Sequence, residues 1–453
     1  MFILSLLYLV LTIIRPQDYM PVLAGVSVLP VVLVFAFLCW LGSSAKTFAA
    51  PQFVILPVFL LALMLSLVFN GWSGGALEQL TNFGPIVIAF FVLAAAVSVN
   101  RSRVVVTLTV FSLCSIVLAL HGVDQFNNGI GWTGMGLSED SRIQYVGIFN
   151  DPNDLGLLFA TSLPMVLYLS ARGGFFRRVF WLAAAVLLLY AIYLTNSRGA
   201  IMAVLAIGAV YLWRKRGLLT ALVLSSFGLM GLMLLPSRMQ ELDVDESSAF
   251  GRVDAWYEGL HMFMSHPLFG VGAGNFTDYN DLTAHNSLVL VLAETGFFGY
   301  ILWLAFVGYG FWMMLTILRF RSQPVAGATR EIGPANTNTN EQAMSTSLVK
   351  VDEPAASDDL AKEDDWQQER GLALTLLLSL CGMFAAAFFL SRSYTVVLYL
   401  LAAVVVGHYI GARRRFPGLP AFSLINDGWR WVPIALASII ALFIIVALLM
   451  HSA

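Results

Sequence analysis

Six arginines in this hydrophobic chain fall on what its charge pattern predicts to be the outer side of a membrane, where basic residues are normally scarce. They are Arg15, Arg142, Arg198, Arg238, Arg252 and Arg392. A guanidinium keeps its charge, and its planar fork can bind a phosphate through two parallel hydrogen bonds. We therefore expect some of these arginines to hold a phosphate-bearing lipid, and the motifs around Arg198 and Arg252 favour these two.

Arg198 lies in the motif TNSRGA, between two short apolar segments. Asn196, Ser197 and Gly199 are typical of turns, so a tight turn between two helices is expected here. An arginine at such a turn could bind a phosphate. The alternative is an arginine that extends to the membrane interface or caps the end of a helix.

Arg252 lies in GRVDAWYEGL, at the start of an apolar pattern with helical spacing over residues 250–264 that includes Trp256. The pattern predicts an amphipathic helix on the membrane surface. A cation in the first turn of a helix is disfavoured by the helix dipole, which suggests an external anion. An ion pair with Asp254 or Asp245 is the alternative.

The motif AHNSLVLVLAETGFFG carries His285 and Asn286 where the chain is expected to re-enter the membrane. Glu294 follows nine residues after His285, or about 13.5 Å along a helix, well inside the bilayer. An acidic side chain at that depth is a candidate functional residue. A carboxyl group that is hydrogen-bonded to a neighbouring helix is the alternative.

Polar residues also crowd the start of another apolar segment, in GIFNDPNDLG. Asn150, Asp151, Asn153 and Asp154 could all contribute to a polar site. The alternative is that Asn153 or Asp154 caps the helix, with Pro152 enforcing the turn.

These residues belong to a chain whose composition indicates an all-α polytopic membrane protein. Of its 453 residues, 59% are hydrophobic and only 11% charged, against about 25% charged in soluble domains. Its three cysteines lie within apolar segments without metal-ligand spacing, so we interpret them as packing residues. The pattern predicts about thirteen transmembrane helices, at 1–14, 20–42, 53–70, 82–99, 104–120, 154–171, 178–195, 199–213, 217–235, 285–318, 371–390, 394–411 and 432–450.

The basic residues set the expected orientation. The chain has 25 Lys and Arg, of which six are the outer arginines. The other 19 all fall in one set of alternating loops, which we place in the cytoplasm. The N-terminus is then cytoplasmic, and the loops 121–153 and 236–284 are periplasmic. Residues 1–320 form ten membrane helices with these loops, and residues 371–453 form the C-terminal membrane helices. The acidic segment 321–370 between them is expected to be a disordered cytoplasmic loop.

Four motifs follow one another along the chain, separated by apolar segments. In order they are GIFNDPNDLG, NSRGA, GRVDAWYEGLHMFMSHPLFGVGAGNF and AHNSLVLVLAETGFFGY. Together they resemble the O-antigen ligase and polymerase superfamily over about residues 145–318. The most specific part runs from Arg252 to Gly299. The acidic segment 321–370 departs from the family's pattern.

The resemblance implies a GT-C-like helical bundle in the bacterial inner membrane, with its active site facing the periplasm. The implied donor is a glycan on undecaprenyl diphosphate. The acceptor is a lipid A core sugar in a ligase, a second lipid-linked glycan in a polymerase, or a protein hydroxyl in an oligosaccharyltransferase. By the same resemblance Arg198 and Arg252 hold the diphosphate and His285 assists the acceptor hydroxyl. Possible supporting residues are Asn286, Glu294, Trp256, Asn150, Asp151 and Asn153.

The implied reaction needs no metal or other cofactor and no nucleic acid. A carrier that flips a lipid-linked sugar is a rival from another class, because it too would need arginines for phosphates. A carrier, however, would favour charges along a path through the bilayer. Here the predicted spans are almost uncharged apart from Glu294, which favours a transferase.

Overall fold

The computed structural model describes residues 1–23, 25–233, 242–320 and 353–452. Within these ranges the chain forms helices and no strands. The principal helices are α1 (Phe2–Ile14), α2 (Val28–Leu41), α3 (Gln52–Phe69), α4 (Ser73–Val97), α5 (Arg101–Asn128), α6 (Pro152–Ser170), α7 (Phe175–Thr195), α8 (Arg198–Arg216), α9 (Leu218–Met233), α10 (Leu242–Ser265), α12 (Ser287–Arg319), α13 (Glu353–Ala387), α14 (Val396–Arg415) and α16 (Trp431–Ser452). Short helices, among them α11 (Phe276–Tyr279) and α15 (Leu424–Asp427), lie in the connections.

The all-α membrane fold expected from the composition is confirmed. Each of the thirteen predicted spans overlaps one of these helices. Within the described ranges, eight helices are long and apolar enough to cross a membrane: Gln52–Phe69, Ser73–Val97, Arg101–Asn128, Phe175–Thr195, Ser287–Arg319, Glu363–Ala387, Val396–Arg415 and Leu424–His451. The helices at Phe2–Ile14 and Val28–Leu41 are apolar but shorter. The count of thirteen transmembrane helices therefore stays a prediction.

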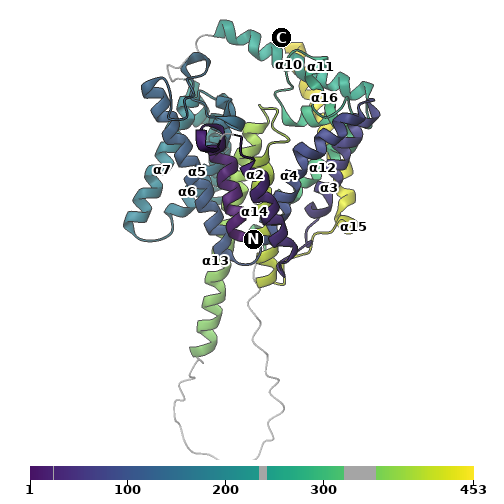
Figure 1. Ribbon diagram of the computed structural model, residues 1–453. Coiled ribbons are helices and arrows are strands. Elements are labelled where there is room, and N and C mark those ends of the chain that lie inside the picture. Colours follow the sequence, from purple (N-terminus) through teal and green to yellow (C-terminus); the bar gives the residue numbers. More distant parts are fainter. Residues whose placement is uncertain (24, 234–241, 321–352, 453) are drawn as a thin grey trace, which may run out of the picture.

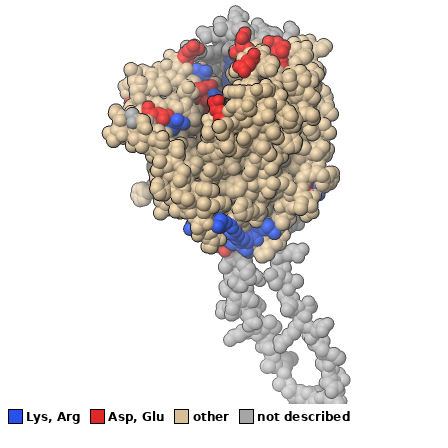
Figure 2. All heavy atoms as spheres, turned by 45° about the vertical axis from the view of Figure 1, so that its right-hand side comes forward, with Lys and Arg blue, Asp and Glu red and all other residues tan. Residues whose placement is uncertain are grey.

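The long helices pack side by side into a bundle with two distinct ends (Figure 1). Helix α12 runs from one end to the other, so we call these the His285 end, where it begins, and the Arg319 end, where it ends. Helix α10 lies at the His285 end and packs against α12 and α16. Figure 2 shows a broad belt of uncharged residues between the two ends, with basic side chains gathered at the Arg319 end. A belt of this kind suits a hydrocarbon environment.

One buried ion cluster fastens the helices at the Arg319 end. Glu369 of α13 is fully buried, and its Oε1 lies 2.9 Å from Arg415 of α14 and 3.7 Å from Arg101 of α5. Its Oε2 lies 3.5 Å from Nδ1 of the buried His408. Because a buried charge is costly without partners, this cluster favours one register of the three helices over others.

The cluster also corrects the prediction of a disordered loop over 321–370. Helix α13 begins at Glu353, so the prediction is wrong for residues 353–370. Trp366 is 2% exposed and its ring packs on Phe320 and Phe416. These contacts join segments that are distant in sequence, so they could not be predicted from the acidic composition of the segment itself. Residues 321–352 lie outside the described ranges.

Two further boundaries differ from the prediction. Helix α5 continues to Asn128, so the outer connection is shorter than 121–153. Helix α10 begins at Leu242, not near residue 250. Arg252 therefore lies in the middle of α10, and the helix-dipole argument made for it from the sequence is wrong.

Candidate active site

The start of α6 is organised by Asp151. Its carboxylate accepts hydrogen bonds from the backbone N–H of Asn153 at 2.8 Å and from the Asn153 side chain at 3.0 Å. Asp151 is thus the N-cap residue, and Pro152 occupies the first helical position. The alternative considered from the sequence, that Asn153 or Asp154 caps this helix, is wrong because Asp151 is the cap. Asn150 ends the short helix that precedes it.

Asp154 instead binds Arg392, which lies in the loop between α13 and α14. The Arg392 Nε donates to the Asp154 carboxylate, and its terminal nitrogen lies 3.6 Å from Asp151. Asp154 is almost buried, with 6% exposure. The pair therefore fixes the 388–395 loop against the start of α6.

The same loop is fastened to the start of α12 through Ser287. The Ser287 hydroxyl donates to the Leu390 carbonyl at 2.6 Å and accepts from the Arg392 N–H at 3.0 Å. The Ser393 hydroxyl donates to the Ser287 carbonyl at 2.8 Å. Two chain segments about a hundred residues apart are thereby held in register beside His285.

His285 lies in the turn that leads into α12. Its φ of 45° is in the left-handed region, which a residue with a Cβ adopts at a cost of about 1–2 kcal/mol. The next residue, Asn286, is fully buried and caps α12 by accepting from the N–H of Leu288 at 2.9 Å and of Val289 at 3.3 Å. Among the described residues, the Asn286 amide nitrogen has no hydrogen-bond partner.

Charged groups from three other segments surround His285. Partial burial and the positive charge of Arg252 lower the pKa of His285 from its ordinary 6.5, and Arg392 adds to this effect while Asp151 opposes it. The imidazole is therefore neutral at neutral pH. A neutral imidazole can accept a proton, as a general base must.

Arg252 reaches this region from α10, which Trp256 anchors. The Trp256 side chain is 7% exposed, and its ring meets Phe388 of the α13–α14 loop edge to face at 5.7 Å. Leu260, one turn further on, is also buried, whereas Tyr257 and Met264 are exposed. The predicted amphipathic helix is thus present, and the Arg-x-x-x-Trp spacing places the arginine one turn from the anchoring tryptophan.

Arg198 is the first residue of α8, after the predicted tight turn. Asn196 adopts the left-handed conformation with φ 49°, and Ser197 caps α8 by accepting from the Ala200 N–H at 3.3 Å. The Arg142 Nε donates to the Thr195 carbonyl at 2.8 Å, and another Arg142 nitrogen donates to Asn153 at 3.0 Å. This arginine ties the Arg198 turn to the start of α6.

Close backbone packing also holds the Arg198 turn. A Cβ atom on Gly156 of α6 would lie 2.8 Å from the Ala200 Cβ and 3.3 Å from the Ser197 Cβ. A Cβ on Gly199 would meet the Phe389 Cβ at 3.5 Å. The turn therefore lies against both α6 and the α13–α14 loop, and Arg198 itself is exposed at the His285 end.

Glu294 lies where α12 is broken. Gly296 has φ 61° and ψ −164°, outside the helical region, and this break frees backbone groups that bind the glycine-rich segment 267–272. The N–H groups of Val271 and Gly272 donate to the carbonyls of Ala293 and Glu294 at 3.0 Å each. Irregular backbone at membrane depth requires such internal partners.

The Glu294 side chain fastens the same region. Glu294 is 2% exposed and accepts a hydrogen bond from the Tyr394 hydroxyl at 2.8 Å. The backbone amides of Gly274 and Phe276 lie against the same carboxylate. These contacts favour the alternative of a hydrogen-bonded carboxyl group, although its side-chain partner lies in the α13–α14 loop and not in a neighbouring helix. Glu294 thus holds the loop of Arg392 and the glycine-rich segment on α12.

The structure thus brings His285, Arg252, Asp151 and Arg392 together, with Arg198 on a turn that is packed against the same elements. The role of Arg392 was missed from the sequence. Its place among the outer arginines was the available signal, but its acidic partner lies 238 residues away.

Arg238 lies outside the described residues. Among the residues described, no three His, Cys, Asp or Glu side chains gather as metal ligands would, and metal independence stays a prediction.

The comparisons with known proteins bear on this same region. The family model described as O-antigen ligase matches residues 183–304. The matched segment contains Arg198, Arg252, Trp256, His285 and Glu294, and it confirms the resemblance to the O-antigen ligase and polymerase superfamily. No curated protein matches the chain closely enough to add a relative.

Proposed function

We propose that this chain, a member of the O-antigen ligase and polymerase superfamily, is a glycosyltransferase that moves a glycan from undecaprenyl diphosphate to an acceptor hydroxyl. The observation that carries the proposal is the arrangement around His285. Arg252 on α10 and His285 in the turn before α12 both lie in the family-matched region. Arg252 is close enough to His285 to lower the pKa of the imidazole. A cation for a phosphate and a base for a hydroxyl are the two groups such a transfer needs.

The proposed reaction forms one bond and breaks another at the anomeric carbon of the donor. The acceptor oxygen attacks this carbon, its proton passes to the His285 imidazole, and the bond to the diphosphate oxygen breaks. The lipid diphosphate leaves with the electron pair. Arg198 and Arg252 neutralise the charge that develops on it, an electrostatic contribution of about 2.7–4 kcal/mol for a single well-placed donor.

Asp151 and Arg392 have positioning roles in this proposal. Arg392 joins the α13–α14 loop to α6 through Asp154 and Asp151, and that loop carries the ring on which Trp256 packs. The separation between the cationic group and the base therefore depends on this ion pair. Arg392 also disfavours the protonated form of His285 by its charge.

The periplasmic face of the inner membrane is the proposed location of the site. The His285 end lies opposite the end where basic side chains gather, and basic residues favour the cytoplasmic side. The charged groups of the site collect at one end of the bundle and do not follow a path through it. This arrangement favours a transferase over a carrier.

The surface glycan of a strain that lacks the protein tests the proposal. Loss of all long glycan from the acceptor, with accumulation of lipid-linked polymer, identifies a ligase. Retention of one repeat unit on the acceptor identifies a polymerase, and loss of glycan from protein alone identifies an oligosaccharyltransferase. The wild-type gene should restore the glycan and His285→Ala should not. His261→Ala is a matched control, because His261 is exposed on α10. An unchanged surface glycan in the deletion strain would contradict all three.

A further inference from the structure

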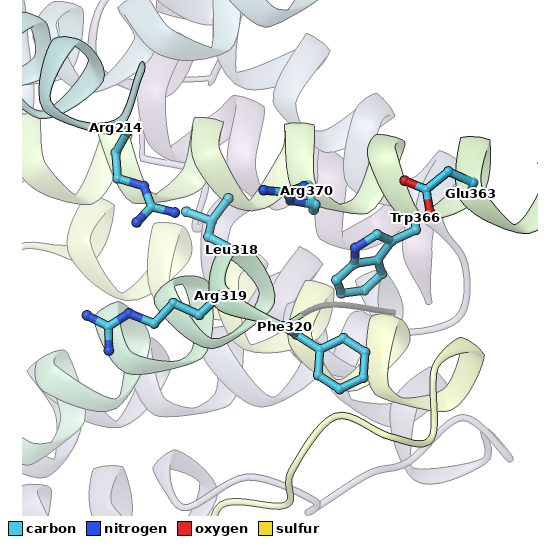
Figure 3. A pocket seen from close by; sticks show the side chains of 7 residues that line it. All are labelled: Arg214, Leu318, Arg319, Phe320, Glu363, Trp366 and Arg370. Carbon is cyan, nitrogen blue, oxygen red and sulfur yellow. The ribbon is translucent and has the colours of Figure 1, made fainter. Parts of the chain in front are cut away.

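A cavity of about 650 Å³ opens at the Arg319 end, far from the candidate active site. Three arginines line it: Arg214 from the last turn of α8, Arg319 from the last turn of α12 and Arg370 from α13. Figure 3 shows Arg214 and Arg319 on one side of the cavity, with Trp366 and Glu363 on the opposite side. Three helices distant in sequence thus direct cations to one space.

The arginines of this cavity differ from their neighbours at the same end of the bundle. Arg101 pairs with Asp365 and with the buried Glu369, and Arg415 pairs with Glu369. By contrast, no ion pair or hydrogen bond joins the side chains of Arg214, Arg319 or Arg370 to any described residue. The one acidic lining residue, Glu363, accepts from Gln367 at 2.6 Å. Three arginines and one glutamate leave the lining with a net charge of +2.

Helix dipoles alone do not account for this arrangement. Arg214 and Arg319 each lie in the last turn of a helix, where a cation is favoured by about 0.3–1 kcal/mol. That interaction is satisfied whichever way the side chain points, and it needs no cavity. Arg370 lies in the interior of α13, so its presence has no such explanation.

The surroundings indicate the boundary between membrane and water. Trp366 and Phe320 give the cavity an aromatic wall. Trp213, next to Arg214, is 55% exposed, and aromatic residues of this kind concentrate at the headgroup level of a bilayer. The cavity therefore lies where the polar end of a lipid would lie.

We propose that this cavity binds the phosphate of a phospholipid headgroup through Arg214, Arg319 and Arg370. Arginine binds phosphate in preference to other groups because its fork matches two phosphate oxygens. Basic pockets between membrane helices are suited to anionic headgroups. The bound lipid would join the ends of α8 and α12 to the middle of α13. These are the helices that begin or end beside Arg198, His285 and Arg392 at the opposite end. The proposal does not depend on the glycan transfer proposed above.

Native mass spectrometry of the purified full-length protein in detergent tests this site. The probes are phosphatidylglycerol, diacylglycerol as the same chains without phosphate, and glycerol phosphate as the phosphate without chains. We expect the wild type to retain phosphatidylglycerol and not diacylglycerol. Each of Arg214→Gln, Arg319→Gln and Arg370→Gln should weaken this binding about tenfold, as expected for loss of one charge-assisted hydrogen bond. The triple variant should abolish it.

Arg178→Gln is the matched control, since Arg178 is an exposed arginine at the same end of the bundle, in the first turn of α7. It should bind phosphatidylglycerol as the wild type does. Glycerol phosphate binding that the three variants remove would keep the phosphate site and assign it to a soluble ligand. Wild-type phosphatidylglycerol binding by all three single variants would overturn the proposal. Thermal unfolding without lipid establishes that each variant is folded.

Discussion

At the scale of single residues, the outer arginines divide by what they hold. Arg15 pairs with Asp18 at 2.5 Å, Arg142 binds Thr195 and Asn153, and Arg392 binds Asp154. Arg142 and Arg392 fix chain segments to one another, whereas the Arg15 pair is local. We assign Arg198 and Arg252 to the donor diphosphate because of the motifs in which they lie, so we expect removal of either to weaken donor binding.

Arg252 and His285 should fail in different ways. We expect Arg252→Ala to weaken donor binding and abolish transfer, and Arg252→Lys to recover little, because a point charge cannot replace a bidentate fork. His285→Ala should slow transfer by about 10²–10⁴, the usual contribution of a general base, with donor binding almost unchanged. The measurement is donor binding and single-turnover transfer by purified protein. Loss of donor affinity in His285→Ala but not in Arg252→Ala would reverse the two roles.

Substitution of the charged residues around His285 should shift the pKa of its imidazole upward or downward, and the pH dependence of transfer should shift with it. Transfer should fall as pH drops through the lowered pKa of His285, because protonation removes the base. Arg392→Gln removes a positive charge that lowers this pKa, so the acid limb should move to higher pH. Asp151→Asn removes a charge that raises it and keeps a capping side chain, so the limb should move to lower pH. Rate profiles that shift together, or not at all, would remove His285 from the role of base.

At the scale of elements, the break in α12 is the feature that shapes the site. Gly296 has a backbone conformation that is essentially restricted to glycine, and Gly270 packs directly on the chain at Glu294. The freed backbone groups of α12 bind the segment 267–272. This segment in turn lies between α10 and the turn of His285, so the break affects how Arg252 and His285 are placed relative to each other.

Gly296→Ala should therefore unfold the site region. Its Cβ would lie 2.5 Å from the Leu268 carbonyl carbon, and the backbone strain adds about 1–3 kcal/mol. Gly310→Ala in the same helix is the matched control, since its Cβ would meet only Leu380 and Val405 at 3.7 Å. Thermal unfolding in detergent, followed by size-exclusion chromatography, should show a loss of stability for Gly296→Ala alone. Equal stability of both variants would contradict the account of the break.

The sequence predicted the elements better than their contacts. Apolar runs and turn residues located a helix of the described residues in each of the thirteen predicted spans, and also the turn at Arg198, because these depend on neighbours in sequence. The start of α13 was missed because Trp366 and Glu369 are ordered by Phe416, Arg101 and Arg415. For the same reason the motifs named His285 and Arg252 but not Arg392, whose role depends on distant acidic residues.

At the scale of the whole molecule, the proposed function requires one particular orientation of the protein in the membrane. Because Lys and Arg concentrate in loops at the Arg319 end, we expect that end to face the cytoplasm and the His285 end the periplasm. Gly174, before α7, and Asp281, before α12, are exposed positions at opposite ends of the bundle. In a variant without the three native cysteines, Asp281→Cys should react with an impermeant thiol reagent in intact spheroplasts. Gly174→Cys should react only after lysis, and the reverse pattern would place the candidate site in the cytoplasm and exclude a periplasmic donor.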